Sequence, residues 1–359
     1  MTTILYTLVA LLVFGLLIAV HELGHFLAAK FCGVRVNEFS IGMGPAVWKK
    51  ETGETRYALR LLPVGGYCAM EGEGEAADDD PRALCNQGFW KKLLIFAAGS
   101  AMNFLAGVVI IAILYAGAKG FYVDQIVGFA EGFPHEGENG LMVGDRFYSI
   151  DGYRTYMAGD ASLYLIYNDG NGMDLVVLRN GEKVVLKDFP MYRAEYIGTD
   201  GAAYRGFGIY VGSGLEEATF GVRWKYVWYT ALDFVQMVRF SLTQMITGNA
   251  GMEDIGGPVA IVGTITQAGT QAESPRAAAD NILFIAALVA VNLSVMNLLP
   301  IPALDGGHIF FLVLNTVAFK LFGKKIPEKL EMALTSVFLV ALLILMVLIA
   351  INDVRNLIG

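Results

Sequence analysis

The residues His21-Glu22-Leu23-Gly24-His25 lie inside a long apolar run, and they carry the most informative chemistry of the chain. Side chains four positions apart on a helix share one face, so both imidazoles can reach one zinc ion. The glutamate between them can hold a water molecule on that ion and act as general base. The spacing therefore predicts a metal site with His21 and His25 as ligands and Glu22 as the base.

The same spacing also arises by chance on solvated helices, so the surroundings of the motif decide between the two interpretations. In residues 1–29 these two histidines and this glutamate are the only side chains that could carry charge near neutral pH, and the first Lys or Arg is Lys30. Ionisable groups at membrane depth are costly and usually functional. The apolar setting therefore favours a metal site.

Composition indicates a protein with several membrane spans. The chain has 359 residues, of which 55% are hydrophobic and 17% charged, and its mean hydropathy is +0.52. An ordinary soluble protein is less apolar and more charged. The net charge of −8 and the lack of a basic patch in the sequence argue against nucleic acid as a partner.

The first membrane half is predicted to cover residues 1–118, with spans at about 4–32 and 93–118. We expect no cleaved signal peptide, because no basic region precedes the first apolar run and that run continues into the metal motif. Residues 33–88 alternate like strands and predict a β-rich hairpin region at the membrane. This region could add a strand to an extended substrate or be purely structural, and the residues leave both open.

Two features of the 33–88 region are expected to play no part in catalysis. Its acidic run at 71–80 predicts a solvated flexible loop, since it lacks the ligand order of an EF-hand. The cysteines of the chain show no CxxC spacing and are expected to be reduced structural thiols; they are Cys32, Cys68 and Cys85.

Residues 119–213 predict one small α+β domain inserted between the membrane halves. Asn180-Gly181 between two β-type runs is typical of a hairpin. Residues 140–152 resemble the signature of PDZ domains, in which Gly-Leu and Gly-Asp turns lead into a strand that ends in Asp-Gly. PDZ domains capture peptide ends by strand addition, so peptide ends are expected partners. Residues 214–280 then predict amphipathic interfacial helices or a plain linker.

The second membrane half, residues 281–359, is predicted to hold a broken third span and an unbroken fourth span at about 330–351. Pro300, Pro302, Asp305 and two glycines fall close together, which predicts irregular backbone against protein or a water-filled cavity. Basic residues in 33–88 and before the last span predict that both segments are cytosolic. About four spans then place the N-terminus and the inserted domain outside, whereas two separate spans at 281–322 would turn the later lysine loop outward.

A catalytic zinc usually has three protein ligands and one open position. Asp305 and His308 are the candidates for the third ligand. Asp305 is favoured because two glycines follow it and leave its carboxylate approachable, but the chemistry alone leaves His308 open.

Two distant motifs together resemble the site-2 protease family of intramembrane zinc metalloproteases. The first is HELGH, and the second is Asn297-Leu298-Leu299-Pro300-Ile301-Pro302-Ala303-Leu304-Asp305-Gly306, which matches the family's NxxPxPxLDG pattern. The order of motifs and the single PDZ-like insert are similar to the bacterial RseP/RasP branch, over essentially the whole chain. The resemblance implies one zinc ion per chain, bound by His21, His25 and Asp305, with Glu22 as general base.

The resemblance also implies that Asn297, and Asn103 in a GxxxN element, hold the substrate or its oxyanion, although a lone membrane Asn is otherwise most often a packing residue. His308 is then a packing or supporting residue. The chain departs from the family at Gly99-Ser100, where Gly-Pro is common.

The implied function is regulated intramembrane proteolysis of single-span substrates, such as anti-sigma factors or signal-peptide remnants. The implied setting is the bacterial cytoplasmic membrane, with the lipid bilayer as a partner and the active site towards the cytosol. A non-catalytic PDZ adaptor would not need both motifs, and a transporter would be expected to show internal repeats.

Overall fold

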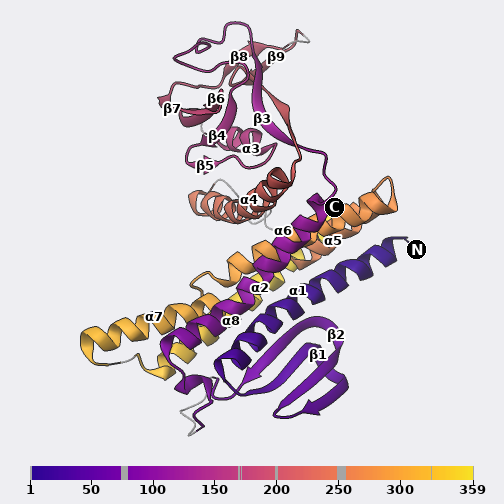
Figure 1. The fold of residues 1–359 in the computed structure, drawn as a ribbon, viewed down its shortest axis with the longest axis vertical. Coiled ribbons are helices and arrows are strands. Elements are labelled where there is room, and N and C mark those ends of the chain that lie inside the picture. The colour runs from indigo at the N-terminus through magenta and orange to yellow at the C-terminus, as the bar shows by residue number, and fades with distance from the viewer. Residues whose placement is uncertain are drawn as a thin grey trace. The chain divides into compact units, whose positions relative to one another are not determined.

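The computed structural model describes residues 2–73, 80–168, 170, 172–198, 201–248, 256–324 and 326–358. The chain divides into two compact units. Unit 1 consists of Met1–Ile111 and Val238–Gly359, and unit 2 consists of Ala112–Met237 (Figure 1). Part of the acidic run predicted as a flexible loop, residues 74–79, lies outside the described residues.

Five helices in the described part of the chain are long and apolar enough to cross a membrane. They are α1 (Thr2–Cys32), α2 (Phe89–Tyr115), α6 (Pro275–Asn297), α7 (Asp305–Phe322) and α8 (Glu328–Ile358). The chain is therefore a multi-pass membrane protein. The first predicted span matches α1 closely, and the second lies a few residues earlier than predicted.

The third predicted span is two helices, which raises the number of candidate spans above the expected four. The backbone between Asn297 and Asp305 is turns, as the two prolines there predicted. Pro300 and Pro302 lack a backbone N–H, and Ala303 has a φ of 85°, so no continuous helix can pass through this segment. The orientation of the chain in the membrane stays a prediction.

A shorter helix, α5, and a capped start of α6 precede the later candidate spans of unit 1. The helix α5 (Pro258–Thr270) packs on α1, where Ala10 and Ile265 are both buried. Asp353 of α8 accepts hydrogen bonds from the first backbone amides of α5, at Gly257 and Ala260. Ser274 caps α6 by accepting a bond from the Ala277 amide, with Pro275 at the first helical position.

The β-rich region predicted at 33–88 is confirmed as two long strands, β1 (Val36–Thr52) and β2 (Thr55–Met70). The register is unusual, because residues 38–41 of β1 pair with two parts of β2, namely 66–69 and 56–59. The later part of β1 pairs with the start of β2. The segment 66–70 therefore forms one edge of this sheet.

Arg60 fixes this folded hairpin by bonding across its strands. Its guanidinium donates to Ser40 Oγ at 2.7 Å and to Glu38 Oε1 at 2.6 Å. Tyr67 donates to the same Glu38 oxygen at 2.6 Å. Because Tyr67 belongs to the edge segment, the network ties that edge to the centre of the sheet.

Unit 2 contains a sheet with strand order β10-β3-β4-β6-β7 and a short strand β5 paired to β4. Its elements are β3 (Gly120–Phe129), β4 (Arg146–Ile150), β5 (Tyr153–Arg154), α3 (Asp160–Tyr167), β6 (Met173–Arg179), β7 (Glu182–Phe189) and β10 (Ile209–Glu217). A separate hairpin is formed by β8 (Ala194–Ile197) and β9 (Ala203–Gly206). The helix α4 (Phe220–Thr247) begins in unit 2 and continues into unit 1.

Two turn motifs of unit 2 have clear structural roles. The predicted hairpin at Asn180-Gly181 is confirmed, with φ of 52° and 88° joining β6 to β7. In the Gly-Asp turn, the buried Asp145 accepts two hydrogen bonds from the Arg179 guanidinium, at 2.9 and 2.8 Å. The PDZ-like identity of residues 119–213 stays a prediction.

Candidate metal centre

Three side chains from two candidate spans meet inside unit 1. His21 and His25 lie one turn apart on α1, and Asp305 is the first residue of α7. Asp305 Oδ2 lies 3.3 Å from His21 Nε2 and 3.4 Å from His25 Nε2. The two Nε2 atoms are 3.2 Å apart. Within the described residues, this is the group of His, Cys, Asp and Glu side chains whose spacing suits a metal ion.

The three distances fit a tetrahedral zinc site. Zinc binds His nitrogen and carboxylate oxygen at about 2.0–2.1 Å, so tetrahedral ligands stand roughly 3.3 Å apart. Asp305 Oδ2 is also buried and has no hydrogen-bond partner among the described residues. A buried carboxylate oxygen that faces two imidazole nitrogens needs a cation, and three ligands leave a fourth position open.

The second imidazole is oriented by the main chain of α2. His25 is buried, and its Nδ1–H donates a hydrogen bond of 2.8 Å to the carbonyl oxygen of Ile95. This bond fixes the proton on Nδ1 and leaves the Nε2 lone pair for a metal. This contact could not be predicted from the sequence, because any residue at position 95 supplies a carbonyl.

The two predicted substrate-binding asparagines lie beside the Nδ1 edge of the His21 imidazole. The side-chain nitrogens of Asn103 and Asn297 are each 3.5 Å from His21 Nδ1, on the opposite side of the ring from Nε2. Asn103 is almost fully buried, while Asn297 is partly exposed at the end of α6. The structure therefore brings both predicted residues to the site.

Two glycines allow α1 and α2 to approach closely at this point. A Cβ atom added at Gly24 would stand 2.4 Å from the carbonyl oxygen of Ala98. A Cβ atom added at Gly99 would stand 2.3 Å from His25 Nε2 and 2.7 Å from His21 Cε1. Both glycines lie inside the quoted motifs, but their role as a helix-contact surface was missed.

The structure separates the two candidates for the third ligand. His308 lies one turn along α7, and its ring stacks on Phe96 with centroids 5.2 Å apart. The group with metal spacing contains Asp305 and not His308. Asp305 therefore remains the proposed third ligand, and His308 packs on Phe96.

Glu22 lies beside the ligands and against the edge of the β1–β2 sheet. Its carboxyl interacts electrostatically with His25, His21 and Asp305. A Cβ atom added at Gly66 would stand 3.2 Å from Glu22 Cγ. Glycine inside a strand pattern often marks a place where another group approaches the backbone closely. The Gly65-Gly66 pair could therefore have predicted a close neighbour of this strand.

Comparisons with known proteins agree with this chemistry. The model of peptidase family M50 matches residues 9–345. A relative from Clostridium perfringens, named as a candidate zinc metalloprotease, is 34% identical and the alignment covers 98% of each chain. Similarly named relatives from Clostridium acetobutylicum and Synechocystis are 33% and 30% identical, with 96% and 99% of this chain covered and 96% of each relative. The ligand geometry and these matches together show that the chain belongs to peptidase family M50, the site-2 protease family of zinc metallopeptidases.

Proposed function

We propose that this protein is an intramembrane endopeptidase that cleaves single-span membrane proteins, in the manner of regulated intramembrane proteolysis. The observation that carries the proposal is the convergence of His21, His25 and Asp305 from two helices that are long and apolar enough to cross a membrane. A hydrolytic site at that depth acts on peptide bonds that lie within the membrane. Anti-sigma factors and signal-peptide remnants are the substrate types that we propose.

His21 and His25 through Nε2, and Asp305 through Oδ2, are the proposed zinc ligands. When bound, zinc lowers the pKa of a water ligand and polarises the scissile carbonyl. Glu22 accepts the proton of the attacking water on its carboxylate and then delivers it to the leaving amide nitrogen. The Asn297 side-chain amide donates a hydrogen bond to the oxyanion that develops on the carbonyl oxygen.

The edge segment 66–70 is the proposed docking strand for the substrate. A helical peptide bond hides its carbonyl in a hydrogen bond, so a substrate helix has to unwind before cleavage. Strand addition to a sheet edge holds a peptide extended. The close approach of Gly66 to Glu22 supports this role: a Cβ atom added at Gly66 would stand 3.2 Å from Glu22 Cγ, so one end of the edge lies beside the proposed base.

Residues 119–213, within unit 2, are the proposed PDZ-like domain for peptide ends, on the outer side of the bacterial cytoplasmic membrane, with the metal site towards the cytosol. In the described sheet β10 is an end strand that pairs with β3 alone. Such an edge can accept a further strand from a peptide. Binding at this domain would then gate the access of substrates by size.

The test uses detergent-solubilised protein and a single-span substrate with a trimmed ectodomain. We expect cleavage by the native chain, inhibition by a zinc chelator, and recovery when zinc is restored. Glu22→Gln should retain zinc and lose at least about 100-fold in turnover, since general base catalysis contributes about 10²–10⁴-fold. Asp305→Ala should lose both zinc and cleavage.

The two variants separate the parts of the proposal. Cleavage that survives Glu22→Gln would contradict the role of that residue. Full zinc binding by Asp305→Ala would contradict its role as a ligand. A native chain that binds zinc but cleaves only soluble peptides would contradict the proposed substrate class.

A further inference from the structure

The β1–β2 sheet has two faces, and the face away from α1 carries a group of polar side chains. On the α1 side, Phe39 and Cys68 pack with residues of that helix in one apolar core. Successive side chains of a strand point to opposite faces, so Tyr67 points away from α1. There its hydroxyl meets the side chains of Glu38 and Arg60. We call this group the far-face network, and it consists of Glu38, Ser40, Arg60 and Tyr67.

Arg60 joins three stretches of the hairpin through this network. Its guanidinium donates to Ser40 Oγ and Glu38 Oε1 at the centre of β1. It also donates to the carbonyl oxygen of Gly44, further along β1, at 2.7 Å, and to the hydroxyl of Tyr67 on the edge segment. The N–H groups of a guanidinium have fixed directions, so four acceptors around one guanidinium are held in one geometry.

The link between the network and the edge is a closed triangle of hydrogen bonds. Tyr67 accepts from Arg60 and donates to Glu38 Oε1 at 2.6 Å, and Arg60 donates to that same oxygen. Hydrogen bonds to charged groups are stronger than neutral ones. The side chains of Glu38 and Arg60 are only 14% and 22% exposed, so water screens their attraction less than at an open surface. The triangle therefore fixes Tyr67 firmly.

The residue before Tyr67 approaches the proposed base from the other face of the sheet. A Cβ atom added at Gly66 would stand 3.2 Å from Glu22 Cγ and 3.9 Å from Ile18 Cγ2. Neighbouring residues of the edge are thus held from opposite sides, Tyr67 by the network and Gly66 against α1. The position of the edge backbone relative to Glu22 therefore depends on the network.

This dependence matters for any strand that pairs with the edge. The register of an added strand follows from backbone hydrogen bonds, whose pattern in a ladder repeats every two residues. A slip of two residues keeps the side chains on the same faces, whereas a slip of one reverses them. Movement of the edge would therefore bring a different peptide bond, two residues away, to Glu22.

We propose that the far-face network sets the register of the substrate strand on the edge segment 66–70 and so selects which peptide bond is cleaved. Arg60 is its central positioning residue, and Tyr67 passes the constraint to the edge. This inference rests on the proposed docking of an extended substrate at that edge. The network acts through the edge backbone and not by contact with the reacting atoms.

The test makes two measurements on the zinc-loaded, full-length protein in detergent. Hydrogen exchange reports how firmly the amides of 66–70 are held, and product masses from a single-span substrate report the position of the cut. Tyr67→Phe removes only the hydroxyl that joins the edge to Glu38 and Arg60. We expect exchange in 66–70 to rise about ten-fold, as for loss of a hydrogen bond to a charged group. We also expect new products cut two residues from the native position.

Two further variants separate the network from the fold of the hairpin. Arg60→Met removes the guanidinium at similar length and should change exchange and cleavage position in the same direction as Tyr67→Phe. Glu38→Gln keeps an acceptor oxygen for both partners and should cleave at the native position. Zinc content should equal that of the native protein in all variants. If Arg60→Met fails to fold, Tyr67→Phe provides the reading.

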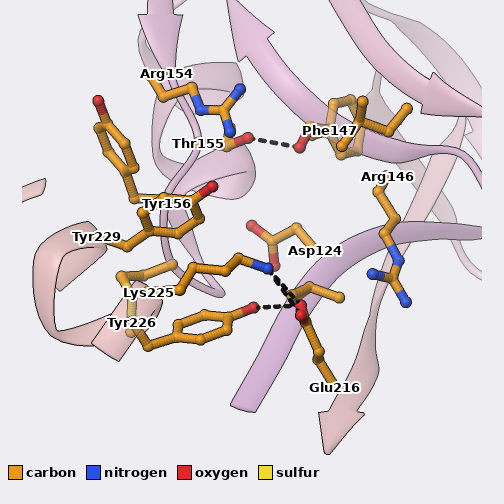
Figure 2. Close-up of a pocket in the computed structure, with 13 residues that line it drawn as sticks. Asp124, Arg146, Phe147, Arg154, Thr155, Tyr156, Glu216, Lys225, Tyr226 and Tyr229 are labelled. Carbon is orange, nitrogen blue, oxygen red and sulfur yellow. Dashed lines mark hydrogen bonds and ion pairs between the residues drawn. The ribbon is translucent and has the colours of Figure 1, made fainter. Parts of the chain in front are cut away.

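Tyr226→Phe is the matched control, because unit 2 contains the same chemistry at the cavity drawn in Figure 2. There the Tyr226 hydroxyl donates to Glu216 at 3.1 Å, and Lys225 Nζ donates to that carboxylate at 2.8 Å (Figure 2). The control removes a hydroxyl from a Tyr–Glu–cation group that belongs to another part of the chain. It should retain native exchange in 66–70 and the native cleavage position.

The outcomes distinguish this inference from the proposed function. Native exchange in 66–70 of Tyr67→Phe would overturn the inference, as would slower cleavage at an unchanged position, which indicates a structural role alone. An equal shift of the cleavage position in Tyr226→Phe would overturn it as well. Absence of cleavage by the native chain would instead contradict the proposed function, and hydrogen exchange would then decide alone whether the network holds the edge.

Discussion

The side-chain nitrogen of Asn103 lies 3.5 Å from Nδ1 of His21, while its buried side-chain oxygen has no hydrogen-bond partner among the described residues. Zinc on His21 Nε2 requires the ring proton on Nδ1, where it becomes a donor. A half-turn of the Asn103 amide would present its oxygen to that donor. Asn103 would then orient His21, as the Ile95 carbonyl orients His25, and Asn297 would remain for the substrate.

Asn103→Leu should therefore lower zinc affinity, because it removes the acceptor at nearly constant volume. Loss of such a supporting partner typically costs 10–100-fold in metal affinity. Asn103→Asp keeps an acceptor oxygen and should stay near the native affinity. Competition with a chromophoric chelator measures both. Equal zinc affinity in Asn103→Leu and the native protein would show that Asn103 does not support the ligand.

Gly99→Ala should disrupt the metal centre without a change in any ligand. The added Cβ would stand 2.3 Å from His25 Nε2, so the imidazole or the whole of α2 has to move. We expect at least about a ten-fold loss of zinc affinity, comparable with the loss of a supporting residue. Gly263→Ala in α5 is the matched control, since nothing lies within 4 Å of its added Cβ. Native zinc binding by Gly99→Ala would mean that α2 can shift freely.

Gly66→Ala should impair catalysis and leave zinc binding intact. Its added Cβ would stand 2.9 Å from the Ser40 carbonyl oxygen and 3.2 Å from Glu22 Cγ. Displacing a catalytic group by about 1 Å can cost roughly 100-fold in rate, and we expect a loss of about ten-fold or more. The measurement compares turnover with zinc content, and Gly88→Ala is the control in an open position. A parallel loss of zinc would place Gly66 in the metal site rather than at the base.

The placement of both histidines of the proposed ligand set was predictable from sequence because its information is local. His21 and His25 are four residues apart, and helix geometry alone puts them on one face. Asp305 was favoured by its two glycines and by the resemblance to the family's NxxPxPxLDG pattern. The structure places its carboxylate near both imidazoles, and its role as a ligand stays a prediction. His308 could not be excluded by chemistry, since only the packing of α7 on Phe96 turns its ring away.

The number of candidate spans was not predictable in the same way. The prolines at 300 and 302 identify where the helix stops, and the structure has turns there. They do not determine whether the chain continues as one broken span or as a second helix, because both interpretations bury the same apolar residues. Likewise, the contact of Gly99 with His25 depends on how α2 is rotated against α1, which a single sequence does not encode locally.

Unit 2 holds a buried pair of carboxyl groups, Asp160 at the start of α3 and Asp233 on α4. The two side chains share a hydrogen bond, which requires a proton between them. Burial raises the pKa of Asp160 to about 6, although the amides of Met157 and Tyr156 oppose the rise. Burial and then the charge of Asp160 raise the pKa of Asp233 to about 8.

These raised pKa values predict that unit 2 becomes less stable as pH rises. An unfolded Asp titrates near about 3.9, so between roughly pH 4 and 8 the native state holds more protons than the unfolded state. The stabilisation is complete below the unfolded pKa and is lost as pH passes through the native values.

Asp233→Asn keeps a donor for Asp160 without a shared proton, so it should flatten this dependence. We expect a gain of about 1–3 kcal/mol at pH 8 relative to the native chain. Urea unfolding, followed by hydrogen exchange in unit 2 at pH 6 and 8, measures the difference. Loss of a proton from a buried carboxyl pair leaves two negative charges facing one another, which should destabilise unit 2 between pH 6 and 8. Equal stability of the native unit at the two pH values would therefore show that the pair does not hold this proton.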